Sequence, residues 1–215
     1  MSITLERTFH PVGQGAFFTE CFDSGNGHKF NVVYDCGTNS PKQGLVNAIN
    51  KTFAKGTRID VVFVSHLDKD HINGIKDLAA NKHLTRQTLF VMPLFSSEVY
   101  VLAYLKYGAS FLQMFRAISN AGCSVLFVRH PKNEKDQQAD DSIDLRENRL
   151  EEELETKSPV GGVSIKTTTI QSGTRLKCFG IWEYVPFNPS GADAVLFQQE
   201  LAKQHIQLDL VISVH

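Results

Sequence analysis

The chain has 215 residues, of which 42% are hydrophobic and 21% charged, with a formal net charge of −1. This length and hydrophobic content exclude a fully disordered chain and fit a single domain over residues 1–215. The charge is uneven, because residues 132–157 carry ten acidic and five basic side chains, which leaves a net charge of +4 on the remainder. A mildly positive body is compatible with a phosphate-bearing substrate.

The cysteines and the absence of long apolar runs indicate the cellular compartment in which we expect the protein. Cys21, Cys36, Cys123 and Cys178 are widely spaced and form no CxxC pair, which favours buried thiols over a zinc ribbon or a disulfide framework. The N-terminus has no apolar signal-peptide core, and no run approaches the roughly 20 apolar residues of a membrane-spanning helix. We therefore expect a cytoplasmic protein that does not enter a membrane.

The pattern of apolar residues predicts antiparallel strands first and α/β alternation afterwards. Strands are expected at residues 2–12, 16–23 and 29–37, separated by glycine-containing turns. The alternation then predicts, in order, a helix at 43–56, a continuous apolar strand at 58–65, a short helix at 72–81, a strand at 88–94, a long helix at 97–120 and a strand at 123–130.

The remaining chain contains one compositional break. Residues 131–162 are dense in charge, and we expect a charged, exposed insertion there, partly helical through 145–155, within the single domain. Strands return at 163–170 and 175–187. An amphipathic helix at 192–206 and a buried strand at 208–215 are expected to follow.

The stretch VFVSHLDKDHINGI, residues 62–75, places two histidines and two aspartates directly after an apolar strand. In an extended segment His66, Asp68 and Asp70 point to one side, and His71 can join them once the next helix begins. Imidazole suits zinc, and carboxylates shift the preference towards manganese or magnesium. The alternative is a solvated loop in which Asp68 or Asp70 caps the following helix.

These residues carry a resemblance to a known family. The run Ser65-His66-x-Asp68-x-Asp70-His71 resembles the metal motif of the metallo-β-lactamase superfamily, in an HxDxDH form. This form is similar to that of the nuclease-like domain of competence DNA-uptake proteins and their soluble relatives. The turn VGQG at residues 12–15 and the strand VVYDCGT at residues 32–38 match two further elements of that domain in order and spacing.

The resemblance implies a fold and a set of site residues. The fold would be α/β, an αββα sandwich of mixed sheets. His66 and Asp68 would bind one divalent ion, zinc or manganese, and Asp70 and His71 a second. Asp35 would orient the loop by hydrogen bonds, although a simple turn aspartate remains the alternative. Hydrolysis by a metal-bound hydroxide is implied, with Asp70 also able to accept the proton of the nucleophile.

The resemblance also leads to expectations about substrate and partners. We expect a nuclease-like hydrolase of phosphodiesters, including nucleic acid. The alternatives are a hydrolase of small esters, thioesters or lactones, and a non-catalytic binding module with a partial metal site. Related domains complete the site with later ligands, for which His130 and His215 are the first candidates. We expect the C-terminal part of the fold to be missing or divergent, with a further segment or a partner chain supplying the remaining ligands.

Overall fold

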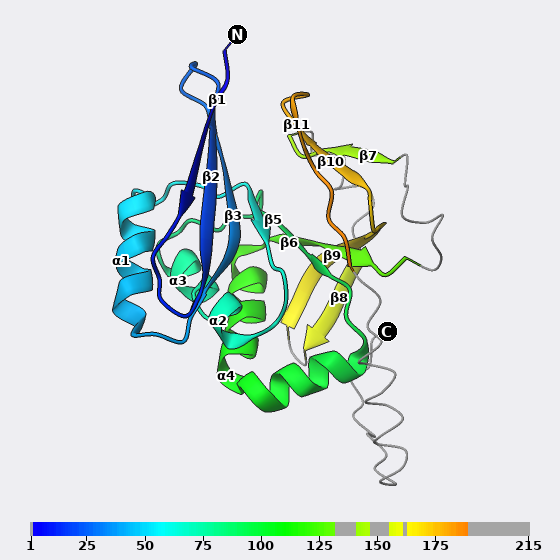
Figure 1. Ribbon diagram of the computed structural model, residues 1–215. Helices are drawn as coiled ribbons and strands as arrows, with labels where there is room; N and C mark the ends of the chain where they lie inside the picture. The colour runs from blue at the N-terminus through cyan, green and yellow to red at the C-terminus, as the bar shows by residue number, and fades with distance from the viewer. Residues whose placement is uncertain (1, 132–140, 147–154, 161–162, 189–215) are drawn as a thin grey trace, which may run out of the picture.

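The computed structural model describes residues 2–131, 141–146, 155–160 and 163–188. These residues form an eight-stranded sheet, a three-stranded sheet and a set of helices (Figure 1). The helix expected at 192–206 and the strand expected at 208–215 lie outside the described residues.

The large sheet is mixed. The hairpin strands β1, β2 and β3 are antiparallel, whereas β3, β4, β5, β6 and β9 run parallel to one another. Parallel strands end at a common edge, where functional side chains are usually displayed. In spatial order its strands are β1 (Thr4–Phe9), β2 (Gly15–Asp23), β3 (Lys29–Thr38), β4 (Val61–Phe63), β5 (Leu89–Pro93), β6 (Ser124–Arg129), β9 (Val163–Gln171) and β8 (Glu155–Val160).

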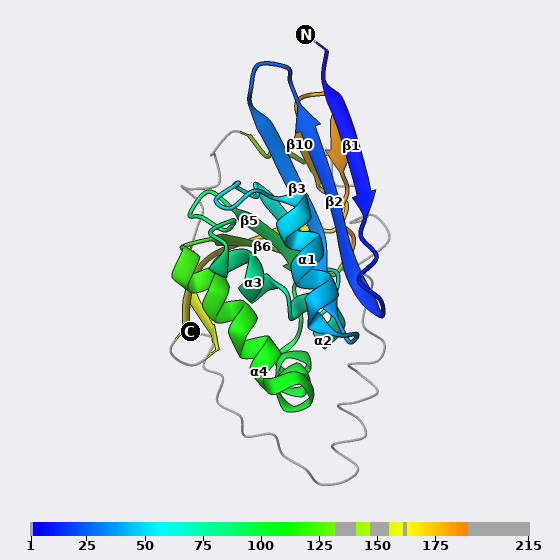
Figure 2. The same cartoon turned by 90° about the vertical axis from the view of Figure 1, so that its left-hand side faces the viewer.

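The helices α1, α3 and α4 lie on one face of the large sheet (Figure 2). Helix α4 changes direction at Gly108, whose φ of 22° and ψ of −88° are not helical, and it ends at Gly122 with a φ of 70°. The single helix expected at 72–81 is two short helices. Among the residues that the structure describes, no helix is both long and apolar enough to cross a membrane. The helices are α1 (Lys42–Thr52), α2 (Lys69–Ile72), α3 (Ile75–Ala80) and α4 (Ser97–Ala121).

Alternation along the strands builds two cores, one on each face of the large sheet. Val33 and Val62 are fully buried in the core that includes the helices. Their neighbours Val32 and Val61 are buried in a second core, shared with the small sheet. The small sheet consists of β11 (Trp182–Tyr184), β10 (Arg175–Cys178) and β7 (Ser142–Asp144). This arrangement of helices and two stacked sheets is consistent with the expected sandwich.

The charged segment 131–162 differs from its expected form where it is described. Residues 142–144 form β7, which pairs with β10, and residues 155–160 form β8, which pairs with β9. Ile143 and Leu145 are partly buried against the second core. Strand pairing and sparse apolar residues thus attach these two stretches to the sheets, and the expectation of an exposed insertion stays a prediction. The expected helix falls mainly on 147–154, outside the described residues.

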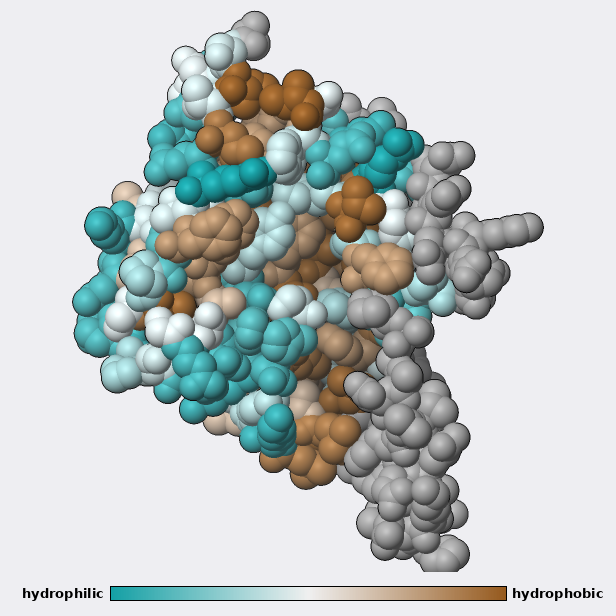
Figure 3. All heavy atoms as spheres, in the orientation of Figure 1, coloured by the Kyte–Doolittle hydropathy of each residue, from teal (hydrophilic) through white to brown (hydrophobic). Residues whose placement is uncertain are grey.

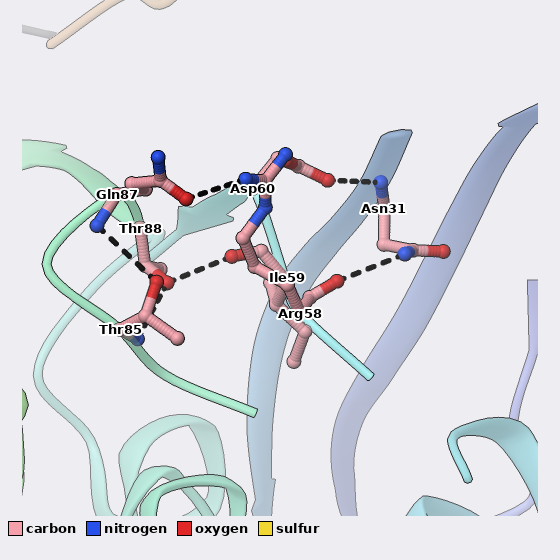
Figure 4. Close-up of polar contacts among 7 residues, drawn as sticks. All are labelled: Asn31, Arg58, Ile59, Asp60, Thr85, Gln87 and Thr88. Carbon is pink, nitrogen blue, oxygen red and sulfur yellow. Dashed lines mark hydrogen bonds and ion pairs between the residues drawn. The ribbon is translucent and has the colours of Figure 1, made fainter. Parts of the chain in front are cut away.

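Polar contacts clamp the amino end of β4 to its neighbours (Figure 4). The carboxylate of Asp60 accepts the backbone N–H of Asn31 at 2.8 Å and pairs with Arg58 at 2.6 Å. The Thr88 hydroxyl donates to the carbonyl of Ile59 at 2.8 Å. These contacts fix the register of β3, β4 and β5 from the end opposite to the loop that follows β4.

Candidate metal centre

The segment Ser65–His71, here called the metal loop, follows β4 and runs into α2. Asp68 stands at the N-cap position of α2, but its side chain makes no capping hydrogen bond. The capping alternative therefore does not account for Asp68. Its carboxylate instead lies beside His66, with Oδ2 3.9 Å from Nε2 of the imidazole.

Asp35 reaches the metal loop from an irregularity in β3. Phe17 of β2 pairs with Cys36, and the next residue, Phe18, pairs with Tyr34, so Asp35 is an extra residue on its strand. Its φ is +50°, a left-handed conformation, and its side chain is buried. A β-bulge re-aims side chains, and strained backbone of this kind is concentrated at functional sites.

The Asp35 carboxylate holds the metal loop by three contacts. Oδ1 accepts the backbone N–H of Ser65 at 2.8 Å, and Oδ2 accepts the Ser65 hydroxyl at 2.6 Å. Oδ2 also lies 2.8 Å from Nδ1 of His71. Asp35 therefore joins both ends of the loop, and the turn-residue alternative does not explain these contacts.

This network fixes the tautomers of both imidazoles. A carboxylate only accepts hydrogen bonds, so Nδ1 of His71 carries the proton that is donated to Asp35. The Ser65 proton is directed to Asp35 as well, so the Ser65 oxygen accepts from Nδ1 of His66, 2.9 Å away. Each ring consequently keeps its lone pair on Nε2, the form in which a histidine binds a metal.

Two glycines let the backbone of the metal loop approach the hairpin closely. A Cβ atom on Gly37 would lie 2.5 Å from the carbonyl carbon of Asp70 and 2.6 Å from the backbone nitrogen of His71. Gly15 has a φ of +151°, and a Cβ atom there would lie 2.9 Å from the Asp70 carbonyl oxygen. The glycines of the VGQG and VVYDCGT segments thus position the loop by backbone contact.

The four expected ligands share this loop but are not assembled into one coordination group. The ring centroids of His66 and His71 are 3.8 Å apart, and Asp68 lies next to His66. Asp70 is half-buried in the first turn of α2. Within the described part of the chain, no three His, Cys, Asp or Glu side chains are grouped closely enough to hold a metal ion. The donor types and the oriented Nε2 lone pairs fit a divalent ion, whose binding requires the carboxylates to turn towards the histidines.

Lys106, a cation on α4, interacts electrostatically with the acidic side chains of the metal loop. The carboxylates of Asp68 and Asp70 both help to raise the pKa of Lys106, although a hydrogen bond with Tyr107 is the main cause. Lys106 is fully exposed, and its ammonium lies 4.8 Å from the Tyr107 ring centroid. The N-terminal half of α4 therefore adds positive charge beside the acidic loop.

Only one of the two later ligand candidates, His130, lies among the described residues. His130 follows β6, and its Nδ1 lies 3.2 Å from the carbonyl oxygen of Asn188. This contact joins the end of β6 to the segment after β11. His215 lies outside the described residues.

Ser65 is the residue whose role the motif alone did not reveal. Its hydroxyl and its amide both bind Asp35, and its oxygen orients His66. The only sequence signal was its place between the strand and the first histidine, which many unremarkable serines share.

Comparison with known proteins gives a partial match. A family model described as the metallo-beta-lactamase superfamily matches residues 25–85, which run from the β2–β3 turn through the metal loop to the segment after α3. No curated protein and no solved structure matches the chain. Members of that superfamily are generally hydrolases and typically bind divalent metals. The part of this chain that is similar to them contains Asp35, Ser65 and all four residues expected to bind metal.

Proposed function

We propose that the protein is a metal-dependent hydrolase with its reaction centre at the metal loop. The observation that carries this proposal is the hydrogen-bond relay from Asp35 through Ser65 to His66, and directly to His71. In each imidazole, Nδ1 contacts Ser65 or Asp35, so the lone pair on Nε2 is on the side of the ring away from these two residues. A carboxylate that orients a histidine in this way is a recurrent feature of metal sites.

The residues of the metal loop and those around it would have different roles in the reaction. His66, Asp68, Asp70 and His71 would hold the metal, zinc or manganese, with up to two ions. Bound metal would lower the pKa of water and stabilise negative charge on the reacting oxygen. Asp70 would accept the proton of the attacking water, because it is the carboxylate that enters the half-buried first turn of α2. Asp35 and Ser65 would keep the imidazoles oriented.

Phosphodiesters, including those of nucleic acids, are the substrate class that we place first. The support is the HxDxDH sequence, the positive charge of the chain outside its acidic segment, and Lys106 beside the loop. A cation in that position would attract a phosphate group. Small esters, thioesters or lactones are the second candidate, supported by a mainly apolar hollow that borders Asp35 and Ser65.

Metal titration tests the centre without relying on activity. Calorimetry with zinc and with manganese should show binding to the wild type and a sharp loss of affinity in His66→Ala and His71→Ala. His28→Ala is the matched control, because His28 is exposed in the β2–β3 turn. Equal metal content in the wild type and His71→Ala would remove the basis of the proposal.

Hydrolysis assays separate the two substrate classes. Bis-nitrophenyl phosphate and nitrophenyl acetate carry the same chromophore, so their rates can be compared directly. We expect metal-dependent release from the phosphodiester that disappears in Asp70→Ala. Faster metal-dependent release from the acetate, with the same dependence on Asp70, would favour the ester alternative.

A further inference from the structure

A hollow of about 240 Å³ lies beside the metal loop, at the edge where the parallel strands end. Asp35 and Ser65, which both belong to the hydrogen-bond relay, form its polar border. The rest of its lining is almost entirely apolar and aromatic. The residues that matter here are Tyr34, Phe63, Met92, Pro93, Val128 and Phe187.

Two aromatic rings from neighbouring strands line the hollow. Tyr34 of β3 is paired with Phe63 of β4, and their rings stack with centroids 4.8 Å apart and an interplanar angle of 15°. The row of rings continues outwards across the hairpin, through Phe18 to Phe9. Aromatic side chains that line a hollow in this way are suited to contact with another planar ring, by its face or by its edge.

A buried network holds these rings in place. Tyr184 lies 5.0 Å from Phe63 between ring centroids, and its hydroxyl donates to Glu20 at 2.6 Å. Glu20 is also paired with Arg7 at 2.7 Å. Burial raises the pKa of the Tyr34 hydroxyl, and the negative charge of Glu20 raises it further. The aromatic lining is therefore oriented in advance of any ligand.

The opposite wall carries an exposed ring on a fixed backbone. Phe187 is 49% exposed, although the next residue, Asn188, is 4% exposed. The Asn188 side chain donates to the carbonyl of Val128 at 2.7 Å, and its backbone N–H donates to the Ser172 hydroxyl at 2.9 Å. The tether fixes the backbone beside an apolar ring that lines the hollow and is about half exposed.

We propose that this hollow binds a single uncharged planar ring of the substrate and places the ester group next to that ring at the metal loop. The volume supports one ring, because a cavity of about 150 Å³ can hold benzene and drug-sized ligands need about 300 Å³ or more. Aryl esters and pyrimidine nucleotides both present such a ring. Binding of the ring does not depend on the proposed function. Only the placement of the ester group for hydrolysis rests on it.

Binding to the metal-free protein tests the ring site separately from catalysis. Benzyl alcohol and cyclohexylmethanol are probes of similar size, one planar and one not, and chemical-shift titration by NMR reports both. We expect benzyl alcohol to bind at least about five-fold more tightly than cyclohexylmethanol. Thymidine is then added as a competitor, to distinguish a nucleotide substrate from an aryl ester. Displacement of benzyl alcohol by thymidine would indicate that the ring belongs to a nucleotide. No displacement would indicate that it belongs to an aryl ester.

The chain offers a matched pair of variants. Phe187→Ala should weaken benzyl alcohol binding at least about five-fold, whereas Phe9→Ala should leave it unchanged, because Phe9 is 82% exposed and does not line the hollow. Equal binding of the two alcohols, or equal effects of the two variants, would overturn the ring site. Ring binding by a protein that shows no metal-dependent hydrolysis would instead count against the proposed function alone.

Discussion

The Oδ2 atom of Asp35 lies 2.8 Å from Nδ1 of His71, a residue 36 positions further along the chain. This contact links the bulge in β3 to the helical turn in which the metal loop ends. It sets the protonation of one imidazole and, through Ser65, of the other. The chemistry of the loop therefore depends on a carboxylate that we do not expect to touch the metal.

Asp35→Asn should weaken metal binding without unfolding the protein. An amide accepts hydrogen bonds through one oxygen only, so it cannot replace both Oδ1, which accepts the Ser65 N–H, and Oδ2, which accepts from the Ser65 hydroxyl and His71. We expect a loss of about 10- to 100-fold in zinc or manganese affinity by calorimetry, with an unchanged circular dichroism spectrum.

Asp60→Asn is the control for that substitution. Asp60 is also a buried aspartate that accepts a backbone N–H of β3, but it lies at the amino end of β4 (Figure 4). Its replacement should leave metal affinity unchanged. A similar loss in both variants would mean that Asp35 acts through general stability and not through the imidazoles.

Asp60 should also make stability depend on pH in a defined direction. Burial raises the pKa of its carboxyl group above the ordinary value, against the opposing effects of the Asn31 N–H and Arg58. The folded state then binds more protons than the unfolded state just above that ordinary value, so this contribution is lost as pH rises through the folded pKa. In urea unfolding from about pH 4 to about pH 7, the wild type should lose stability relative to Asp60→Asn. A gain over this range would contradict the assignment.

Thiol labelling should single out one cysteine. Cys21 is partly exposed, whereas Cys36, Cys123 and Cys178 are buried. Burial raises the pKa of Cys123 and of Cys178 to about 12, and raises that of Cys36 as well. Since the thiolate is the reactive form, Ellman's reagent should modify Cys21 first in the native protein. Cys21→Ser should abolish the fast phase, and denaturant should expose all remaining thiols.

Strand β7 should contribute to stability despite its charged surroundings. Ile143→Ala removes a partly buried side chain from the second core, and we expect a loss of about 1–2 kcal/mol in unfolding free energy. For a domain of this size that corresponds to a fall of very roughly 2–8 °C in melting temperature. Ser142→Ala, an exposed change on the same strand, should have little effect. An equally small effect of Ile143→Ala would instead support the expectation of an exposed insertion.

The metal loop was predictable because its ligand-type residues are contiguous and follow a continuous apolar strand. Asp35 was implied only by resemblance, since its function depends on a bulge that appears when Phe17 and Phe18 pair with β3. The hollow was not predictable, because Tyr34 and Phe63 become neighbours only through strand register.

The charged segment shows a different limit of sequence reading. Charge density and a low apolar content predicted an exposed insertion. The two apolar residues Ile143 and Leu145 were too few to show the alternation that indicates a strand. Their strand is defined by its pairing with β10, a contact that comes from a later part of the chain. Tertiary pairing overrode the local composition.

The close approach between Gly37 and the backbone of Asp70 and His71 has a consequence for engineering this site. Here backbone packs directly against backbone, so no flexible side chain can move aside to relieve a clash. Adding even one methyl group at Gly37 would push Asp70 and His71, which carry a carboxylate and an imidazole, away from the sheet. Efforts to retune the site therefore have more freedom at the walls of the hollow than at the glycines beneath the loop.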